Sequence, residues 1–191
     1  MSNTIVDIHK DLVEQCLEGR GGAFKALYDL YSRQMFSIAV RYLNDREEAE
    51  DVLQEAFTDA FKNLKSFRGD SSFGSWLKRI VVNKSLNRIK KRKLEFTDLT
   101  TSDPLITGME EEGTADEGYP NLSVSQIQQA MNGLADGFRI VLTLYLFDGF
   151  THSEIARQLG ISEGTSKSQY MRAKLKLKEL ILDQHGEERS T

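Results

Sequence analysis

The sequence predicts an all-α protein in which two helical domains are joined by an acidic linker. Apolar residues recur at spacings of three and four along most of the chain, which is the period of an amphipathic helix. Only two prolines occur in 191 residues, so little interrupts helix formation. Both prolines fall within residues 94–122, a segment without a sustained apolar period. That segment therefore separates the two helical parts.

The first predicted domain spans residues 10–93. One face of its first helix carries the apolar residues Phe24, Leu27, Tyr31, Met35, Ile38 and Tyr42. Asn44 and Asp45 form a capping signal for a second helix, whose apolar stripe includes Leu53 and Phe57. A loop beginning Arg68-Gly69 breaks the pattern, and a third helix then runs from about residue 73 to residue 93.

Residues 94–122 are predicted to form the linker. Residues 94–120 carry eight acids and no base, and a flexible chain of this length spans on the order of 30 Å. This composition favours an extended, solvated segment. The second predicted domain spans residues 123–185.

The second domain contains a helix-turn-helix pattern. Thr151-His152-Ser153-Glu154 is a capping box for a short helix, in which His152 is expected at the surface. Gly160 then follows where a left-handed residue ends a helix, and a longer helix starts near residues 163–165. The second helix of such a motif enters the major groove of DNA. The candidate DNA contacts on this helix are Thr165, Lys167, Ser168, Gln169, Arg172 and Lys176.

Charge is strongly segregated, although the net charge is only −4. Residues 44–59 carry seven acids against one base, whereas residues 62–93 carry eleven bases against one acid. The basic block exceeds what solubility requires and favours neutralisation of phosphates. We therefore expect DNA contacts along the third helix from Lys78, Arg79, Asn83, Lys84 and Arg88.

Aromatic residues interleave with these bases. Phe67 and Phe73 flank the loop that contains Arg68, and aromatic rings near bases can hold the unstacked bases of a single strand. All three residues are predicted to bind DNA, while Phe61 and Trp76 are predicted to be mainly core. In the acidic block, Asp51, Gln54 and Glu55 share one exposed helix face. From the residues alone, the simpler interpretation of that face is a solvated polar surface.

Residues 47–93 resemble region 2 of extracytoplasmic-function sigma factors, most specifically in EDVLQEAF followed by FRGDSSFGSWLKRI. Residues 123–182 resemble region 4, where FDGFTHSEIARQLGISEGTSKSQYMRAKLKL covers the helix-turn-helix. The resemblance implies a sigma factor that binds the β and β′ subunits of core RNA polymerase. It also implies recognition of the minus-ten and minus-thirty-five elements of promoter DNA.

The same resemblance assigns individual roles. It implies that Asp51, Gln54 and Glu55 dock on the coiled coil of the β′ clamp. It also implies that the loop between Phe67 and Phe73 captures a flipped base of the minus-ten element. An anti-sigma factor is a further partner that the resemblance leaves open.

Composition and motifs argue against several other functions. Scattered histidines and the single Cys16 offer no metal-ligand spacing, and no phosphate-binding loop or nucleophile motif is present. We predict no catalytic residue, no cofactor and no metal, and a cytoplasmic protein without membrane insertion. Two alternatives remain: a helix-turn-helix activator without sigma activity, and an adaptor that does not bind DNA. The helical period of residues 1–93 disfavours the first, and the helix-turn-helix disfavours the second.

Overall fold

The computed structural model describes residues 9–91 and 123–188, and within them it contains helices and no strands. The chain divides into two compact units, residues 1–93 and 94–191, each with its own core. The predicted linker, residues 94–122, lies entirely outside the described residues. The all-α prediction is confirmed.

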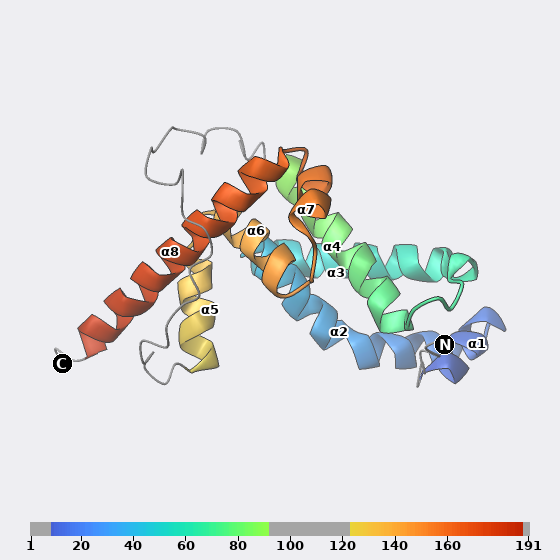
Figure 1. Cartoon of the computed structure of the whole chain (residues 1–191). Coiled ribbons are helices and arrows are strands. Elements are labelled where there is room, and N and C mark those ends of the chain that lie inside the picture. The colour runs from blue at the N-terminus through green and yellow to red at the C-terminus, as the bar shows by residue number, and fades with distance from the viewer. Residues whose placement is uncertain (1–8, 92–122, 189–191) are drawn as a thin grey trace, which may run out of the picture. The chain divides into compact units, whose positions relative to one another are not determined.

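The first unit contains four α-helices and one short 3-10 helix among its described residues (Figure 1). In chain order these are α1 (Lys10–Leu17), α2 (Gly21–Leu43), α3 (Arg46–Lys62), η1 (Leu64–Ser66) and α4 (Phe73–Lys91). Helices α2, α3 and α4 pack against one another in all three pairings, and α1 packs against α2. Helix α1 was not recognised as a separate helix in the sequence, because its eight residues are too few for a clear period.

A short connection joins α2 to α3. Asn44 ends α2 in the left-handed conformation, with φ at 51°, and the Oδ1 of Asp45 accepts a hydrogen bond of 2.9 Å from the backbone N–H of Glu48. The predicted capping signal is therefore confirmed. The chain turns at Asn44 and Asp45, so that α3 follows α2 directly and packs against it.

Helix α4 contacts α2 closely at its first turn. A Cβ on Gly74 would lie 2.7 Å from the Cε1 atom of Tyr31, a distance that real Cβ atoms do not adopt. The ring of Tyr31 is itself held, because it packs edge-to-face on Phe73 and its hydroxyl lies 2.7 Å from Nδ1 of His9. Only glycine at position 74 allows this approach of the two helices.

Ion pairs join the exposed sides of α3 and α4. Lys84 Nζ lies 2.6 Å from Asp59 and 3.4 Å from Glu55, and Arg88 lies 3.3 Å from Glu55 and 3.6 Å from Asp51. The hydrogen bond from Lys84 lowers the pKa of Asp59. Burial alone would lower the pKa of Lys84, but its hydrogen bonds and charge interactions with Asp59 and Glu55 outweigh this and raise it.

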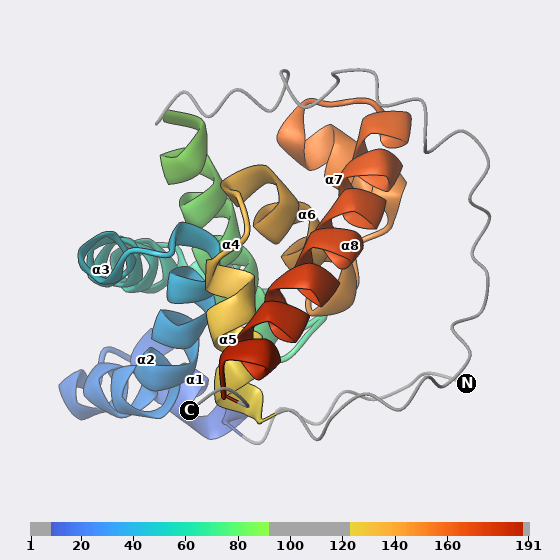
Figure 2. The ribbon, with the colours of Figure 1, turned by 90° about the vertical axis from the view of Figure 1, so that its left-hand side faces the viewer.

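The second unit is organised around its last helix. Its described helices are α5 (Val124–Asn132), α6 (Asp136–Leu146), α7 (His152–Leu159) and α8 (Glu163–Glu188). Helices α5, α6 and α7 each pack against α8 (Figure 2). Both hydrogen bonds of the predicted capping box at Thr151 and Glu154 are present, and Gly160 has φ at 74°. The helix-turn-helix predicted for α7 and α8 is therefore confirmed.

The first prediction concerns the contact between Gly74 and Tyr31. Gly74→Ala should make the first unit less stable by about 1–2 kcal/mol, because overpacking outweighs the better helix propensity of alanine. Gly22→Ala in α2 is the matched control, since a Cβ there meets nothing within 4 Å. Denaturant unfolding of both variants tests this. Equal stability of Gly74→Ala and the wild type would contradict the close approach.

The second prediction concerns the ion pair between Lys84 and Asp59. Lys84→Met should raise the pKa of Asp59 towards the ordinary value of an aspartate, because it removes the largest cause of the depression. A depressed folded-state pKa stabilises the fold above the unfolded-state value, and this stability is lost as the pH falls through the folded-state pKa. NMR titration of the Asp59 carboxyl carbon measures the change, with Lys91→Met as control. If the titration midpoint of Asp59 is unchanged in Lys84→Met, the ion pair between Lys84 and Asp59 is refuted.

Candidate functional site

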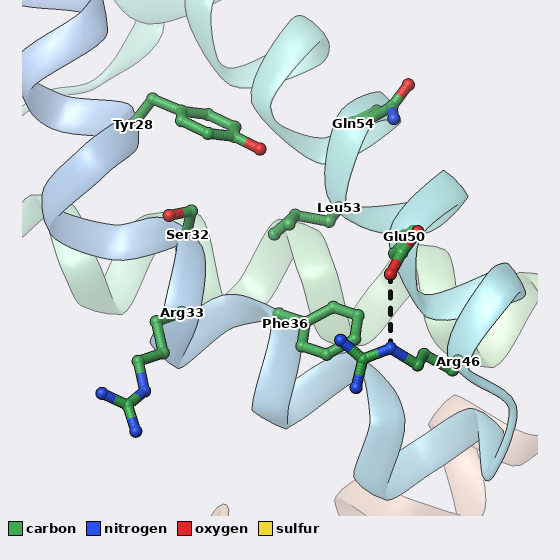
Figure 3. A pocket seen from close by; sticks show the side chains of 8 residues that line it. All are labelled: Tyr28, Ser32, Arg33, Phe36, Arg46, Glu50, Leu53 and Gln54. Carbon is green, nitrogen blue, oxygen red and sulfur yellow. Dashed lines mark ion pairs between the residues drawn. The ribbon is translucent and has the colours of Figure 1, made fainter.

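The three residues predicted to bind core polymerase lie on α3 in two different surroundings. Gln54 lines a groove of about 350 Å³ between α2 and α3 (Figure 3). Asp51 and Glu55 instead form ion pairs with Arg88 of α4. The structure therefore places these residues at the two edges of the exposed face of α3.

The groove between α2 and α3 combines aromatic and charged side chains. Tyr28 and Phe36 of α2 and Leu53 of α3 line it, and the ring of Tyr28 stays 38% exposed. The guanidinium of Arg46 lies 5.0 Å from the centroid of the Phe36 ring and 3.5 Å from Glu50 (Figure 3). Exposed aromatic surface bordered by arginine is typical of protein–protein interfaces.

The carboxylates on the other edge of α3 are paired but accessible. The side chains of Asp51 and Glu55 keep 65% and 56% of their surface exposed. The sequence indicated either a solvated face or a docking face, and neither interpretation included partners on α4. A cation from another protein can still reach both carboxylates, although it competes there with Arg88.

The five polar residues of α4 that were predicted to bind DNA point in three directions. Lys84 and Arg88 face the acids of α3, as described above. Lys78 lines a groove between α4 and α2. Arg79 and Asn83 are exposed. The helix therefore does not present its bases on a single face.

An aromatic cluster lies at the start of α4. The rings of Phe67 and Trp76 lie 5.3 Å apart, and each contacts Phe73, at 6.0 Å and 5.8 Å. Phe73 has no exposed surface, so the prediction that it contacts DNA is wrong for this conformation. It shares the buried face of Leu77 and Val81, four and eight residues further along α4.

Phe67 and Trp76 are the members of the cluster that reach the surface, and both are half-buried. Phe61 and Trp76 were predicted to be mainly core, and both are half-buried in the structure. Arg68 is exposed in the loop between Phe67 and Phe73, and Gly69 in the same loop adopts a φ of 75°. Ser72 ends the loop by accepting a 3.2 Å hydrogen bond from the N–H of Ser75.

Helix α8 carries a second candidate surface. Lys167 and Lys176 are exposed, and they pair within the helix at 2.7 Å with Glu163 and Glu179. These hydrogen bonds lower the pKa of Glu163 and raise the pKa of Lys176. The other predicted contacts that reach the surface, Thr165, Ser168 and Arg172, are half-buried. Both lysines have carboxylate neighbours that DNA phosphates would have to displace.

Two residues of the helix-turn-helix differ from their predictions. Gln169 is only 2% exposed, so the prediction that it reads a base is wrong in this structure. It lies between Ser166 and Ala173 on the helix, both of which are fully buried. His152 is half-buried rather than superficial, because its ring stacks on Tyr145 and its Nδ1 lies 2.9 Å from the Oγ of Ser166.

Among the residues that the structure describes, no three His, Cys, Asp or Glu side chains are placed to hold a metal ion. No helix within residues 9–91 and 123–188 is long and apolar enough to cross a membrane.

Both units match regions of one protein family. Residues 27–95 match the family described as Sigma-70 region 2, and residues 125–177 match Sigma-70, region 4. The chain is 32% identical over 174 residues to the RNA polymerase sigma-H factor of Pseudomonas aeruginosa, covering 86% of this chain and 89% of that protein. It is 31% identical over 181 residues to the ECF RNA polymerase sigma factor SigW of Bacillus subtilis, covering 91% and 97%.

A solved structure agrees with these sequence matches. The sigma factor RpoE in complex with the anti-sigma factor NepR from Bartonella quintana aligns with a TM-score of 0.50 and 27% identity, covering 83% of this chain and 96% of that one. The order of the two regions, the helical fold of each unit and the coverage of the relatives all agree. The chain therefore belongs to the extracytoplasmic-function sigma factors of the sigma-70 family.

Proposed function

We propose that this chain binds core RNA polymerase and directs it to promoters, with the first unit acting at the minus-ten element and the second at the minus-thirty-five element. The observation that carries the proposal is the presence of both sigma regions in one chain, in the order and over the length of the relatives. A helix-turn-helix activator without sigma activity has no need of region 2. In this role the chain acts in the cytoplasm and is an initiation factor rather than an enzyme.

The polymerase-binding surface of the proposal centres on α3. Gln54 borders the groove of Tyr28 and Phe36, and Asp51 and Glu55 keep more than half of their side-chain surface exposed. Aromatic contacts beside accessible carboxylates suit a partner segment with apolar and basic side chains. This arrangement supports docking of the β′ clamp along α3.

The promoter surface of the first unit is proposed on the loop and outer face of α4. Phe67 and Trp76 offer ring surface beside the exposed Arg68, a combination that suits a splayed base with its phosphate. Arg79 and Asn83 lie further along the exposed side of the same helix. Lys84 and Arg88 contribute to DNA binding only where phosphates outcompete the acids of α3.

The promoter surface of the second unit is proposed on the N-terminal half of α8. Arg172 and Ser168 are half-buried, so their conformations are more restricted than those of the exposed lysines. Restricted side chains are suited to reading base edges, and exposed lysines are suited to phosphates. The matched solved structure holds an anti-sigma factor, and we propose such a factor as a further partner of this chain.

One experiment tests the proposed function directly. Purified full-length chain is added to core RNA polymerase, and transcription from a library of promoter fragments is measured. Initiation at a defined subset of promoters supports the proposal. Tight sequence-specific binding to DNA by the chain alone, without initiation in the presence of core, would instead support the activator.

The third prediction concerns polymerase binding. Asp51→Asn combined with Glu55→Gln should weaken association with core polymerase about tenfold, because it removes two charges from the docking face while keeping side-chain shape. Glu47→Gln is the control, since Glu47 is an exposed acid in the first turn of the same helix. Titration of labelled chain with core measures both. An unchanged affinity of the double variant would remove this face from the interface.

The fourth prediction separates base reading from phosphate contact on α8. Arg172→Ala should relax the preference at one base position, whereas Lys176→Ala should weaken all promoters equally and reduce the salt slope by about one. Gln169→Ala should instead lower the stability of the second unit, because Gln169 is buried. Selection from a promoter library, together with thermal unfolding, measures all three. Identical uniform losses for Arg172→Ala and Lys176→Ala would exclude base reading by Arg172.

A further inference from the structure

Three aromatic rings meet in the second unit, where α6, α7 and α8 pack against one another (Figure 2). The imidazole of His152, the first residue of α7, stacks on Tyr145 of α6, with ring centroids 4.5 Å apart and planes 16° apart. Tyr170 of α8 contacts both rings, at 5.5 Å from His152 and 4.6 Å from Tyr145. The two tyrosines therefore hold the imidazole in one orientation.

The same imidazole makes a polar contact with α8. Its Nδ1 lies 2.9 Å from the Oγ of Ser166, and Ser166 has no exposed surface. A buried hydroxyl costs free energy unless it is hydrogen-bonded, whereas an apolar side chain of similar size packs there without that cost. Stability alone therefore does not call for this polar pair. A hydrogen bond does restrict both distance and angle, so the pair adds direction to the contact between α7 and α8.

Ser166 lies among the candidate base-reading residues of α8. Thr165 precedes it, and Ser168 and Arg172 follow within two helical turns. The side chain of Ser168 is itself held, because its Oγ donates a 3.0 Å hydrogen bond to the carbonyl oxygen of Thr165. Backbone hydrogen bonds join successive turns of a helix, so these residues move with Ser166. A shift of Ser166 relative to α7 therefore displaces all three side chains together.

We propose that His152 is a positioning residue for recognition of the minus-thirty-five element. Its ring is fixed by α6, and its Nδ1 sets, through Ser166, the angle at which the N-terminal half of α8 meets the major groove. Base contacts require side chains within about 0.5 Å of their productive positions, so a small rotation of α8 lowers base selectivity. His152 acts without touching DNA. The inference rests on the proposed sigma function and identifies the contact that sets its selectivity at this element.

Four substitutions separate the ring of His152 from its nitrogen. His152→Phe keeps a ring for stacking on Tyr145 but removes Nδ1, and His152→Asn keeps a polar atom near the position of Nδ1 but removes the ring. Ser166→Ala removes the partner oxygen with little change of volume. Ser153→Ala is the matched control, since Ser153 is exposed in the first turn of α7.

The measurement compares promoters that differ by single base pairs. Holoenzyme formed from full-length chain and core polymerase is bound to a promoter that it selects from a library, and to versions with one change in the minus-thirty-five element. His152→Phe and Ser166→Ala should each reduce the affinity ratio about fivefold at bases whose selection also depends on Arg172 or Ser168, the effect of one hydrogen bond. His152→Asn should recover part of the ratio, and Ser153→Ala should keep all of it.

A double variant shows whether the two side chains act through one contact. His152→Phe combined with Ser166→Ala should lose no more selectivity than either single variant, because both remove the same hydrogen bond. Selectivity at the minus-ten element should stay at the wild-type level in every variant. Thermal unfolding is measured in parallel, since a purely structural role of His152 lowers the unfolding temperature and weakens all minus-thirty-five sequences alike.

Different failures have different meanings. If His152→Phe and Ser166→Ala keep the wild-type affinity ratios, or weaken every minus-thirty-five sequence equally, His152 does not position α8, and the inference is overturned while the sigma function stands. If His152→Phe does not fold, the ratio measured for Ser166→Ala decides by the same criterion. If wild-type holoenzyme shows no selectivity at the minus-thirty-five element, the proposed function of the second unit fails, and the inference fails with it.

Discussion

The close approach of α4 to α2 at Gly74 sets the geometry of the first unit. Because no Cβ separates Gly74 from the ring of Tyr31, the first turn of α4 lies directly on α2. Phe73 is then enclosed between Tyr31 and Trp76, which leaves the loop before it at the surface. Lys78 of α4 also lies beside α2, where it lines a groove together with Arg33 and Arg41.

The charged side chains of α4 face α3, α2 and solvent. Lys84 and Arg88 neutralise part of the acidic face of α3, although these acids are the proposed contacts of polymerase. Individual exposed ion pairs of this kind contribute little to stability. These ion pairs matter because DNA phosphates would have to compete with the acids of α3 for Lys84 and Arg88. Net charge alone does not describe such a surface.

The longest helix of the second unit, α8, contributes both to its core and to its proposed DNA surface. Ser166, Gln169 and Ala173 are buried on α8, while Lys167 and Lys176 remain exposed. His152 ties α7 to α8 through Ser166, so the turn between the two helices is held by a polar contact as well as by apolar packing. The arrangement of α7 against α8 thereby determines which side chains can face a promoter.

The sequence by itself predicted most of the helices, their caps and the family, but not the short helix α1. The spacing of apolar residues and the effects of capping residues and glycine extend over only a few residues. The capping roles of Asp45, Thr151 and Gly160 could therefore be predicted from the neighbouring sequence. Tertiary structure alone decided which side of each helix is covered. Phe73 and Gln169 were predicted at the surface and are buried, because burial depends on neighbours that are distant in the chain. The ion-pair partners of Lys84 and the groove that Arg41 and Lys78 line likewise arise only when α4 packs on α3 and α2. A helix exposes all its side chains until another helix covers some of them.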